Sequence, residues 1–241
     1  MTMPSSSAKV VLVTGAAGGL GQGLVSEFAA QGWRVAAAHH HSPSQSATES
    51  IFLLQLDVIH RAQAEDAVSQ ILTRWGRLDV LVNNAGITHD QPLWQIHEAD
   101  WDNLIAVNLK GAFNCAQAAL RPMLKQREGH IINLTSFSGR AGQRGQATYA
   151  AAKSGLFGLT ASLAKEVGSR NVRVNAVLPG VLPTAMTARL KEKQLAELAA
   201  ANALHRVNSI AEVARFVVFL ATLQNVSGQL FQLDSRVARW T

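Results

Sequence analysis

The sequence of 241 residues lacks several features that mark other classes of protein. Its single cysteine, Cys115, excludes a disulfide within the chain, and the apolar run around it favours a buried small residue over a nucleophile. No apolar run approaches the roughly 18 residues that a membrane-spanning helix needs. The Ser-rich residues 1–8 have no apolar centre, so they are not a signal peptide, and we expect them to be flexible. These features predict a cytoplasmic protein with no membrane association.

Acidic and aromatic residues are also few. The chain has 16 Asp and Glu against 22 Lys and Arg, which gives a formal net charge of +6. Such a surplus can indicate nucleic acid or an acidic partner. The basic residues are scattered and only 6% of the chain is aromatic, so we expect no nucleic acid binding. With 48% hydrophobic residues, no linker and no internal repeat, residues 1–241 are expected to form one α/β domain.

Short apolar runs alternate with stretches of helical periodicity along most of the chain. Strands are expected at 9–14, 33–38, 51–56, 79–82, 130–135, 172–177 and 228–233. Helices are expected near 24–29, 64–75, 98–107, 111–126, 149–167 and 210–222. This alternation predicts right-handed crossovers and a parallel sheet, with ligands beyond the carboxyl ends of the strands. Only about a dozen residues separate the second and third strands, so the helix usual there is short or absent.

A glycine-rich turn, Gly15–Gly21, joins the first expected strand to the first helix. Such a turn lets the backbone approach a pyrophosphate, which the helix N-terminus then binds, although a glycine-rich turn alone is a weak signal. The second strand is followed by His39, His40 and His41, with no acid. An acid there would suit the ribose 2′-hydroxyl of NAD, and basic groups the 2′-phosphate of NADP. Contiguous histidines lack the usual spacing of metal ligands, so we expect no metal site.

The only tyrosine of the chain, Tyr149, stands four residues before Lys153 in an Ala-rich helical stretch. The two side chains therefore share one helix face. At about 5 Å and an effective dielectric near 20, the ammonium would stabilise the phenolate by roughly 3 kcal/mol and lower the pKa of the phenol by about two units. This would bring the phenol closer to the range in which proton transfer is useful. On this segment alone, an ordinary surface Tyr–Lys pair is the alternative.

Six short motifs follow one another in a characteristic order: Thr14-Gly15-x-x-x-Gly19-x-Gly21, Asn83-Asn84-Ala85-Gly86, Asn108, Ser136, Tyr149-x-x-x-Lys153 and Pro179-Gly180. Together they resemble the short-chain dehydrogenase/reductase family over nearly the whole chain. The stretches 83–90 and 225–229 look most like those of the 3-oxoacyl-(acyl-carrier-protein) reductases. The resemblance implies a Rossmann-type, doubly wound parallel sheet of seven strands in the order 3-2-1-4-5-6-7, with helices on both faces.

The resemblance also implies roles for individual residues. Tyr149 would be the general acid, and Ser136 would polarise the substrate carbonyl. Lys153 would hold the nicotinamide ribose and lower the pKa of Tyr149, and Asn108 would hold a water of the proton relay. The expected cofactor-binding residues are Gly15, Gly18, Gly19, Leu20, Gly21, His39, His40, Asp57, Val58, Asn83, Ala85, Gly86, Tyr149, Lys153, Pro179, Gly180 and Thr184.

The expected function is the NADPH-dependent reduction of a 3-oxoacyl thioester. Two alternatives stay open: a dehydrogenase of sugars, steroids or small alcohols, and a catalytically silent NADP(H)-binding regulator. Residues 184–204, rich in Ala, Leu, Lys and Glu, are expected to form one or two mobile helices over the site and to decide the substrate.

The resemblance further implies a homotetramer in which the helices near 98–126 and 148–167 pair between subunits. A dimer is the alternative, because the chain has Asp234-Ser235-Arg236 where members often have Asp-Gly-Gly. Arg127 and Arg170 match positions where the acyl-carrier-protein reductases place docking arginines, so we expect them beside the mouth of the site. The alternative is that both are solvated cations at helix ends, which the helix dipole favours.

Overall fold

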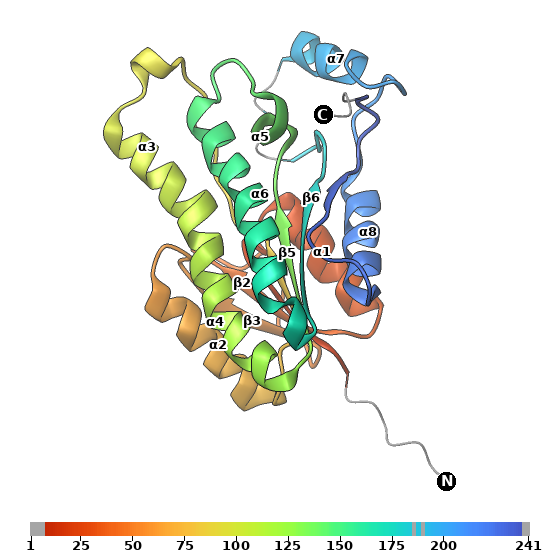
Figure 1. The fold of residues 1–241 in the computed structure, drawn as a ribbon. Coiled ribbons are helices and arrows are strands. Elements are labelled where there is room, and N and C mark those ends of the chain that lie inside the picture. The colour runs from red at the N-terminus through yellow and green to blue at the C-terminus, as the bar shows by residue number, and fades with distance from the viewer. Residues whose placement is uncertain (1–7, 185–186, 189–190, 238–241) are drawn as a thin grey trace.

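The structure, a computed structural model, describes residues 8–184, 187–188 and 191–237. All of its strands join one parallel sheet of seven strands in the order β3-β2-β1-β4-β5-β6-β7 (Figure 1). The strands are β1 (Val10–Val13), β2 (Arg34–His39), β3 (Ile51–Gln55), β4 (Val80–Asn83), β5 (Gly129–Leu134), β6 (Val172–Leu178) and β7 (Leu230–Gln232). This order confirms the expected Rossmann-type sheet.

Helices lie on both faces of the sheet. They are α1 (Gly19–Ala30), α2 (Arg61–Trp75), α3 (Glu98–Ile105), α4 (Gly111–Gln126), α5 (Phe137–Ala141), α6 (Ala147–Val167), α7 (Glu192–Ala200) and α8 (Ile210–Thr222). Three shorter turns are the 3₁₀ turns η1 (Leu93–Gln95) and η3 (Gly168–Arg170) and the π-helical turn η2 (Ala106–Lys110). Helices α1 and α8 cover one face, and α2, α4 and α6 cover the other (Figure 1). Among the described residues, no helix has the length and apolar character needed to cross a membrane.

Two elements differ from what the sequence predicts. Helices α3 and α4 are one continuous helical rod, because η2 carries the backbone from one into the other. The expected loop after Ser136 contains a short helix, α5. Within the described part of 184–204 there is one helix, α7, and residues 185–186 and 189–190 lie outside the description. Of the N-terminal residues 1–8, whose flexibility was expected, 1–7 also lie outside it.

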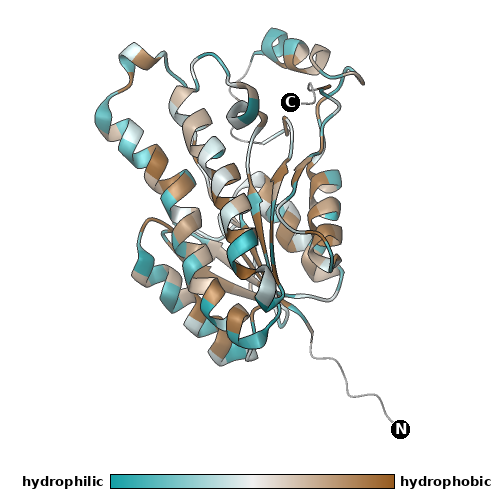
Figure 2. Ribbon diagram, viewed as in Figure 1, coloured by the Kyte–Doolittle hydropathy of each residue, from teal (hydrophilic) through white to brown (hydrophobic). Residues whose placement is uncertain are grey.

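The central strands are buried on both faces, which explains their continuous apolar sequences. Alternate residues of β1 point to opposite faces. Leu12 packs toward α2 and α4, whereas Val11 and Val13 pack toward α1 and α8. Figure 2 shows the strands mainly hydrophobic, with polar residues on the outer turns of the covering helices.

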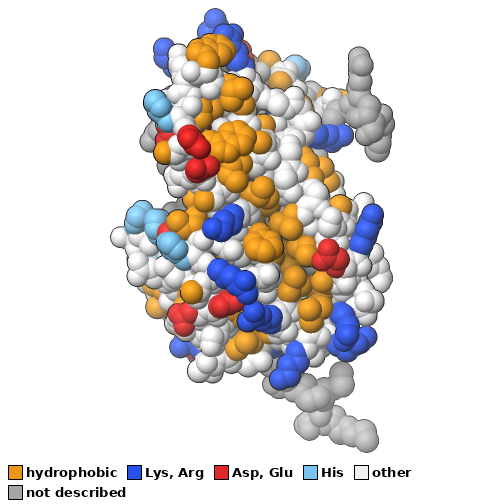
Figure 3. All heavy atoms as spheres, turned by 60° about the vertical axis from the view of Figure 1, so that its left-hand side comes forward, with side chains coloured by type: hydrophobic (Ala, Val, Ile, Leu, Met, Phe, Trp, Pro, Cys, Tyr) orange, Lys and Arg blue, Asp and Glu red, His pale blue; other side chains and the backbone are white. Residues whose placement is uncertain are grey.

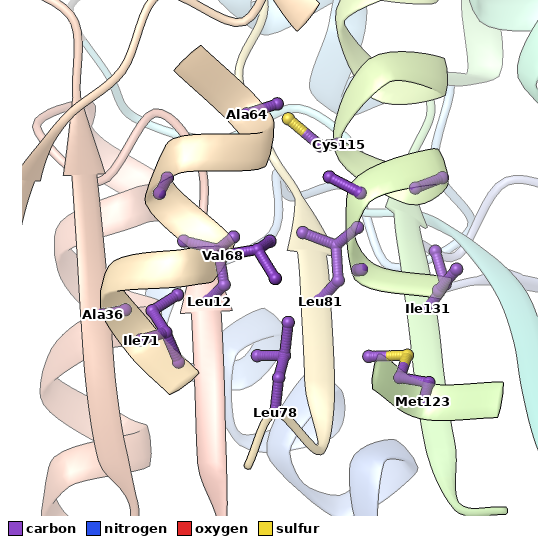
Figure 4. Packing of buried hydrophobic residues seen from close by; sticks show 14 of the residues in the cluster. Leu12, Ala36, Ala64, Val68, Ile71, Leu78, Leu81, Cys115, Met123 and Ile131 are labelled. Atoms are coloured by element: carbon purple, nitrogen blue, oxygen red, sulfur yellow. The ribbon is translucent and has the colours of Figure 1, made fainter. Parts of the chain in front are cut away.

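The core under α2 and α4 contains the only cysteine. Leu12, Leu81 and Ile131 of the central strands meet Val68 and Ile71 of α2 there, with Cys115 and Met123 on the α4 side (Figure 4). Burial raises the pKa of the Cys115 thiol to about 12. A protonated, buried thiol is unreactive, as the sequence suggests.

A second buried feature is polar. His130 of β5 is fully buried and lies 2.8 Å from the side-chain nitrogen of Asn175 on β6. The Asn175 amide is oriented by two further bonds: its oxygen accepts from Gln229 N, and its nitrogen donates to Val226 O. The amide nitrogen therefore donates to Nε2 of His130, which accepts only while it is unprotonated. Burial, with the nearby charge of Arg173 adding to it, lowers the pKa of His130 to about 3.

This environment predicts acid sensitivity. Between pH 6.5 and about 3 the unfolded chain binds a proton at His130 that the folded chain does not, so stability falls as the pH falls through that window. At two pH units below 6.5 the loss is about 2–3 kcal/mol. We expect the free energy of unfolding of His130→Gln, measured in urea, to fall less steeply over this window than that of the wild type. The exposed His97→Gln is the control, and parallel profiles for wild type and His130→Gln would contradict the assignment.

Candidate active site

The carboxyl ends of the central strands open into a cavity of about 490 Å³. The glycine-rich turn after β1 forms one side, and the ends of β4, β5 and β6 form the floor. Leu198 of α7 contributes to the opposite wall. Of the four predicted catalytic residues, Ser136, Tyr149 and Lys153 line this cavity.

The glycine-rich turn is pressed against the end of β4. Gly15 has a φ of +63°, and a β-carbon there would lie 2.8 Å from Cα of Ala85. Thr14 joins the two segments, because its hydroxyl oxygen accepts from the backbone N–H groups of Asn84 and Ala85 at 3.0 and 3.1 Å. Only glycine permits this close approach of the two chain segments.

Helix α1 begins at this turn without a side-chain cap. Gly18 occupies the capping position and offers no side-chain oxygen, and the first turn has no acidic residue. The first N–H groups of the helix therefore have no side-chain acceptor and face the cavity side of the sheet. An uncapped, glycine-lined N-terminus of this kind fits a phosphate group.

The ammonium of Lys153 is buried beside Tyr149. Its Nζ donates to Leu134 O at 2.9 Å and lies 5.7 Å from the centroid of the Tyr149 ring. Burial lowers the pKa of Lys153 to about 8. Burial also raises the pKa of Tyr149 to about 12, opposed by its hydrogen bond with Ser136, and the carboxylate of Asp90 raises it further. The expected lowering of the Tyr149 pKa is therefore not found, since desolvation outweighs an ammonium that points toward a carbonyl.

Asn108 lies behind the cavity, in the π-helical turn. Its Oδ1 accepts from Ile87 N at 3.1 Å, and its Nδ2 donates to Ile87 O at 2.9 Å and to Leu104 O at 3.1 Å. A β-carbon on Gly86 would lie 2.6 Å from Asn108 Oδ1 and 3.5 Å from Lys153 Nζ. Asn108 therefore positions the strand end that faces Lys153. The π turn itself, a feature often found at functional sites, has no signal in the sequence.

Ser136 follows β5 and caps the short helix α5. Its hydroxyl oxygen accepts from Ser138 N at 3.2 Å, which fixes where α5 starts. The same hydroxyl reaches Tyr149. The thirteen-residue spacing in the sequence thus corresponds to a direct contact between the two side chains.

The predicted adenosine-binding residues lie at the ends of β2 and β3, outside the cavity wall. His40 is exposed, and its Nε2 lies 3.4 Å from Asp57 Oδ2. His60, which the sequence analysis did not single out, approaches the same oxygen at 3.6 Å. His39 is the last residue of β2, and Val58 packs into the core. Within the described residues, no group of three or more His, Cys, Asp or Glu could hold a metal ion.

The remaining predicted cofactor residues divide into two groups. Asn83 points into the core, where its Nδ2 donates to Ala112 O and to Asn133 Oδ1, and its neighbour Asn84 lines the cavity instead. The other residues of this set that line the cavity are Gly15, Gly18, Gly19, Leu20, Gly21, Ala85, Gly86, Pro179, Gly180 and Thr184.

A polar cluster at the Tyr149 end of the cavity was missed by sequence reasoning. Gln146 Nε2 donates to Asp90 Oδ2 at 2.8 Å, and Ser138 Oγ donates to Gln146 Oε1 at 2.7 Å. All three residues line the cavity. The only sequence signal was the polar character of the loop before Tyr149, which says nothing about where its side chains point.

A glycine-lined helix N-terminus and a Ser–Tyr–Lys cluster that share one cavity define a class, the dinucleotide-dependent oxidoreductases with a Rossmann-type sheet. Residues 9–195 match the family model described as short chain dehydrogenase, and the chain belongs to this family.

Curated relatives match over almost the full length of both chains. The 3-oxoacyl-(acyl-carrier-protein) reductase FabG of Thermotoga maritima is 40% identical over 236 residues, which are 94% of this chain and 96% of the relative. FabG of Staphylococcus aureus is 38% identical, with the same coverage. The reductase of Synechocystis is 37% identical and covers 96% and 98%. A solved structure titled "ElxO with NADP Bound" superposes with a TM-score of 0.88 at 28% identity, over 95% of this chain and 98% of that one.

Proposed function

We propose that the protein is an NADPH-dependent reductase of 3-oxoacyl thioesters, with Tyr149 as the general acid. The observation that supports this most is the shared cavity of Ser136, Tyr149 and Lys153 beside the glycine-rich turn. Full-length similarity to reductases named for 3-oxoacyl-carrier substrates favours this substrate class over other ketones.

The residues present fit a dinucleotide. The uncapped N-terminus of α1, with Gly18 and Gly19 at its start, would hold the diphosphate, and Lys153 would hold the nicotinamide ribose. Pro179, Gly180 and Thr184 would face the nicotinamide end, although only the last could offer a side-chain hydroxyl. Bound NADPH supplies the hydride, so the protein's task is to position the carbonyl and to deliver a proton.

Proton delivery falls to Tyr149. With a pKa of about 12 the phenol is protonated at neutral pH, which is the form that a reduction needs. Ser136 donates a hydrogen bond to the carbonyl oxygen, and Tyr149 transfers its proton to that oxygen as negative charge develops. The phenolate left behind lies near the Lys153 ammonium, which stabilises it, and Asn108 holds the strand end in place.

Replacement of the phenol tests this role. Tyr149→Phe should fold and bind NADPH as the wild type does, because only the hydroxyl is lost. Turnover should fall by roughly 10²–10⁴-fold. The measurement is kcat with an acetoacetyl thioester. The control is the affinity for NADPH, monitored by fluorescence. A variant that keeps more than half of the wild-type kcat would exclude Tyr149 as the acid.

The two alternative functions are separated by one assay series. NADPH oxidation with acetoacetyl thioesters, sugars and steroids would identify the substrate class. Turnover of sugars or steroids in preference to thioesters would favour a dehydrogenase of other alcohols. NADPH binding without turnover of any carbonyl would favour a non-catalytic regulator.

We also propose a preference for NADPH over NADH. In the sequence no acidic residue directly follows β2, which ends at His39 and is followed by His40. The Asp57 carboxylate at the end of β3 lies near the imidazoles of His40 and His60. An imidazole can donate a hydrogen bond to a 2′-phosphate, whereas a carboxylate would repel it. The ratio of kcat/KM for NADPH to that for NADH should therefore exceed one at pH 7. His40→Asp should lower the ratio and the exposed His97→Asp should not. A preference of the wild type for NADH at pH 7 would refute the proposal.

An exposed apolar face bears on whether the protein forms an oligomer. Trp101 of α3 and Phe113 of α4 are 38% and 44% exposed, and Figure 3 shows hydrophobic side chains gathered on this side of the molecule. We propose that a second copy covers α4 and α6 across a two-fold axis, within a homotetramer, with a dimer as the alternative.

The position of Arg127 and Arg170 links their proposed docking role to this proposed assembly. Arg127 and Arg170 are neighbours, since Arg127 Nη2 donates to Ser169 O, but both precede strands of the sheet and lie at its amino edge. The six residues of β5 separate this edge from the cavity, at about 3.3 Å each. Within one chain the arginines are therefore not beside the mouth of the site, contrary to expectation. In a two-fold dimer with antiparallel α4 and α6, they would approach the partner's cavity.

A charge-reversal experiment tests whether Arg127 and Arg170 dock an acidic carrier protein. Arg127→Glu with Arg170→Glu should raise KM for a carrier-linked substrate, more strongly at low salt, and leave a free thioester almost unaffected. Arg206→Glu with Arg215→Glu, the same charge change on exposed residues elsewhere, is the control, and light scattering checks the assembly. Equal loss on both substrates would show that the arginines are structural. No loss on either would show that the substrate is a free molecule.

A further inference from the structure

The segment Gln232–Arg236, where the chain departs from the expected Asp-Gly-Gly, contacts the walls of the cavity from outside. We propose that Arg236 is a positioning residue: it holds the face of Phe137 and thereby keeps Ser136, the preceding residue, in place for the reaction. The proposal rests on the proposed function, which gives Ser136 its role at the carbonyl.

The guanidinium of Arg236 makes two contacts, one through its face with Phe137 and one through its edge with Asp234. Its carbon Cζ lies 3.8 Å from the centroid of the Phe137 ring. Its Nε donates to Asp234 Oδ2 at 2.7 Å, and Nη2 donates to the same oxygen. The side chains of Arg236 and Asp234 are only 14% and 3% exposed. A planar guanidinium can stack on a ring and pair with a carboxylate at the same time, which a lysine ammonium cannot do.

The backbone around the pair is also tied down. Gln232 Nε2 donates to Asp234 Oδ1 at 2.8 Å and to Arg236 O at 2.7 Å. Arg236 N donates to Asp234 Oδ1 at 3.2 Å. Because the tail itself is ordered by these bonds, Arg236 presents a fixed surface to Phe137.

Phe137 is the first residue of α5, whose start is fixed by Ser136. The far side of α5 is packed against α6: Ser154 Oγ donates to Gly139 O, and a β-carbon on Gly139 would lie 2.8 Å from the backbone carbon of Lys153. Helix α5 therefore lies between the Lys153 helix and Arg236. With five residues it has too few internal hydrogen bonds to hold its own position.

Asp234, the partner of Arg236, also contacts the turn at Gly180. A β-carbon on Gly180, at φ +79°, would lie 2.8 Å from Cβ of Asp234, so the carboxylate backs the turn proposed to face the nicotinamide. Asn208 supports the same turn, since its Nδ2 donates to Pro179 O at 2.9 Å and to Leu233 O at 3.1 Å. Loss of the ion pair should therefore affect cofactor binding, and loss of the ring contact alone should affect the chemical step.

Two substitutions separate these effects. Arg236→Lys keeps a cation beside Asp234 but loses the planar contact with Phe137, so NADPH affinity should stay within about twofold while kcat falls roughly tenfold, since small misplacements of a reacting group are costly. Arg236→Ala loses both contacts, so kcat should fall further and NADPH affinity should also fall. Arg74→Lys, at an exposed arginine whose guanidinium lies over the Phe52 ring, is the matched control and should leave both quantities unchanged.

Hydrogen exchange of the protein without substrate gives a readout independent of turnover. In Arg236→Lys, amides of residues 137–141 should exchange faster, while the strands of the core keep their protection. Phe137→Leu should reproduce the kcat loss, and the double variant with Arg236→Lys should be no worse than either single one, because both remove one contact.

Several results would overturn the proposal. One is that Arg236→Lys keeps the kcat of the wild type and the wild-type rates of hydrogen exchange at residues 137–141. Another is additive losses in the double variant, and a third is faster exchange throughout the sheet, which would show a merely structural role. If the wild type reduces no carbonyl compound, the proposed function fails, and the exchange at 137–141 still decides whether Arg236 holds α5.

Discussion

The arrangement of the site depends on one buried charge whose hydrogen bond goes to a backbone carbonyl. Lys153 is 4% exposed, and its ammonium donates to the carbonyl of Leu134, the last residue of β5. Burial of an ammonium is costly, and this cost lowers its pKa to about 8. The charge is tolerated because β5 ends there, and its last carbonyl is free to accept a hydrogen bond from a helix on the same edge.

The surroundings of this lysine explain which small residues the chain uses. Gly86 faces the ammonium and the Asn108 amide, and a β-carbon there would come within 2.6 Å of Asn108 Oδ1. Gly139 lies against the backbone of Lys153 from the other side. Asn108 can reach Ile87 because the π turn widens the helix at that point. Strand end, helix turn and α5 are thus all packed around one side chain.

Much of this could be predicted from the sequence, and the exceptions share a cause. The parallel sheet follows from the alternation of apolar runs with helical stretches, which are local properties. The strand order and the meeting of Ser136 with Tyr149 were expected only from the resemblance to the family, and the structure has both. Helix α5 was missed because five residues carry no helical period, and its position depends on contacts from distant segments such as Arg236. The direction of the Tyr149 pKa shift was predicted wrongly because the sequence shows a neighbouring charge but not the desolvation that outweighs it. Likewise, the location of Arg127 follows from where β5 begins relative to the cavity, which requires the sheet itself.

Burial shifts the pKa values of Tyr149 and Lys153 in opposite directions, and both groups stay protonated at neutral pH. It raises that of Tyr149 to about 12 and lowers that of Lys153 to about 8. Both groups are therefore protonated at neutral pH, one neutral and one charged. In the proposed reaction this is the state that reduction requires, because the phenol holds the proton to be given and the ammonium is ready for the phenolate. Oxidation of an alcohol starts from the phenolate, which this environment disfavours until the pH is strongly alkaline. The desolvation of Tyr149 and Lys153 therefore favours the protonation states that the proposed reduction needs.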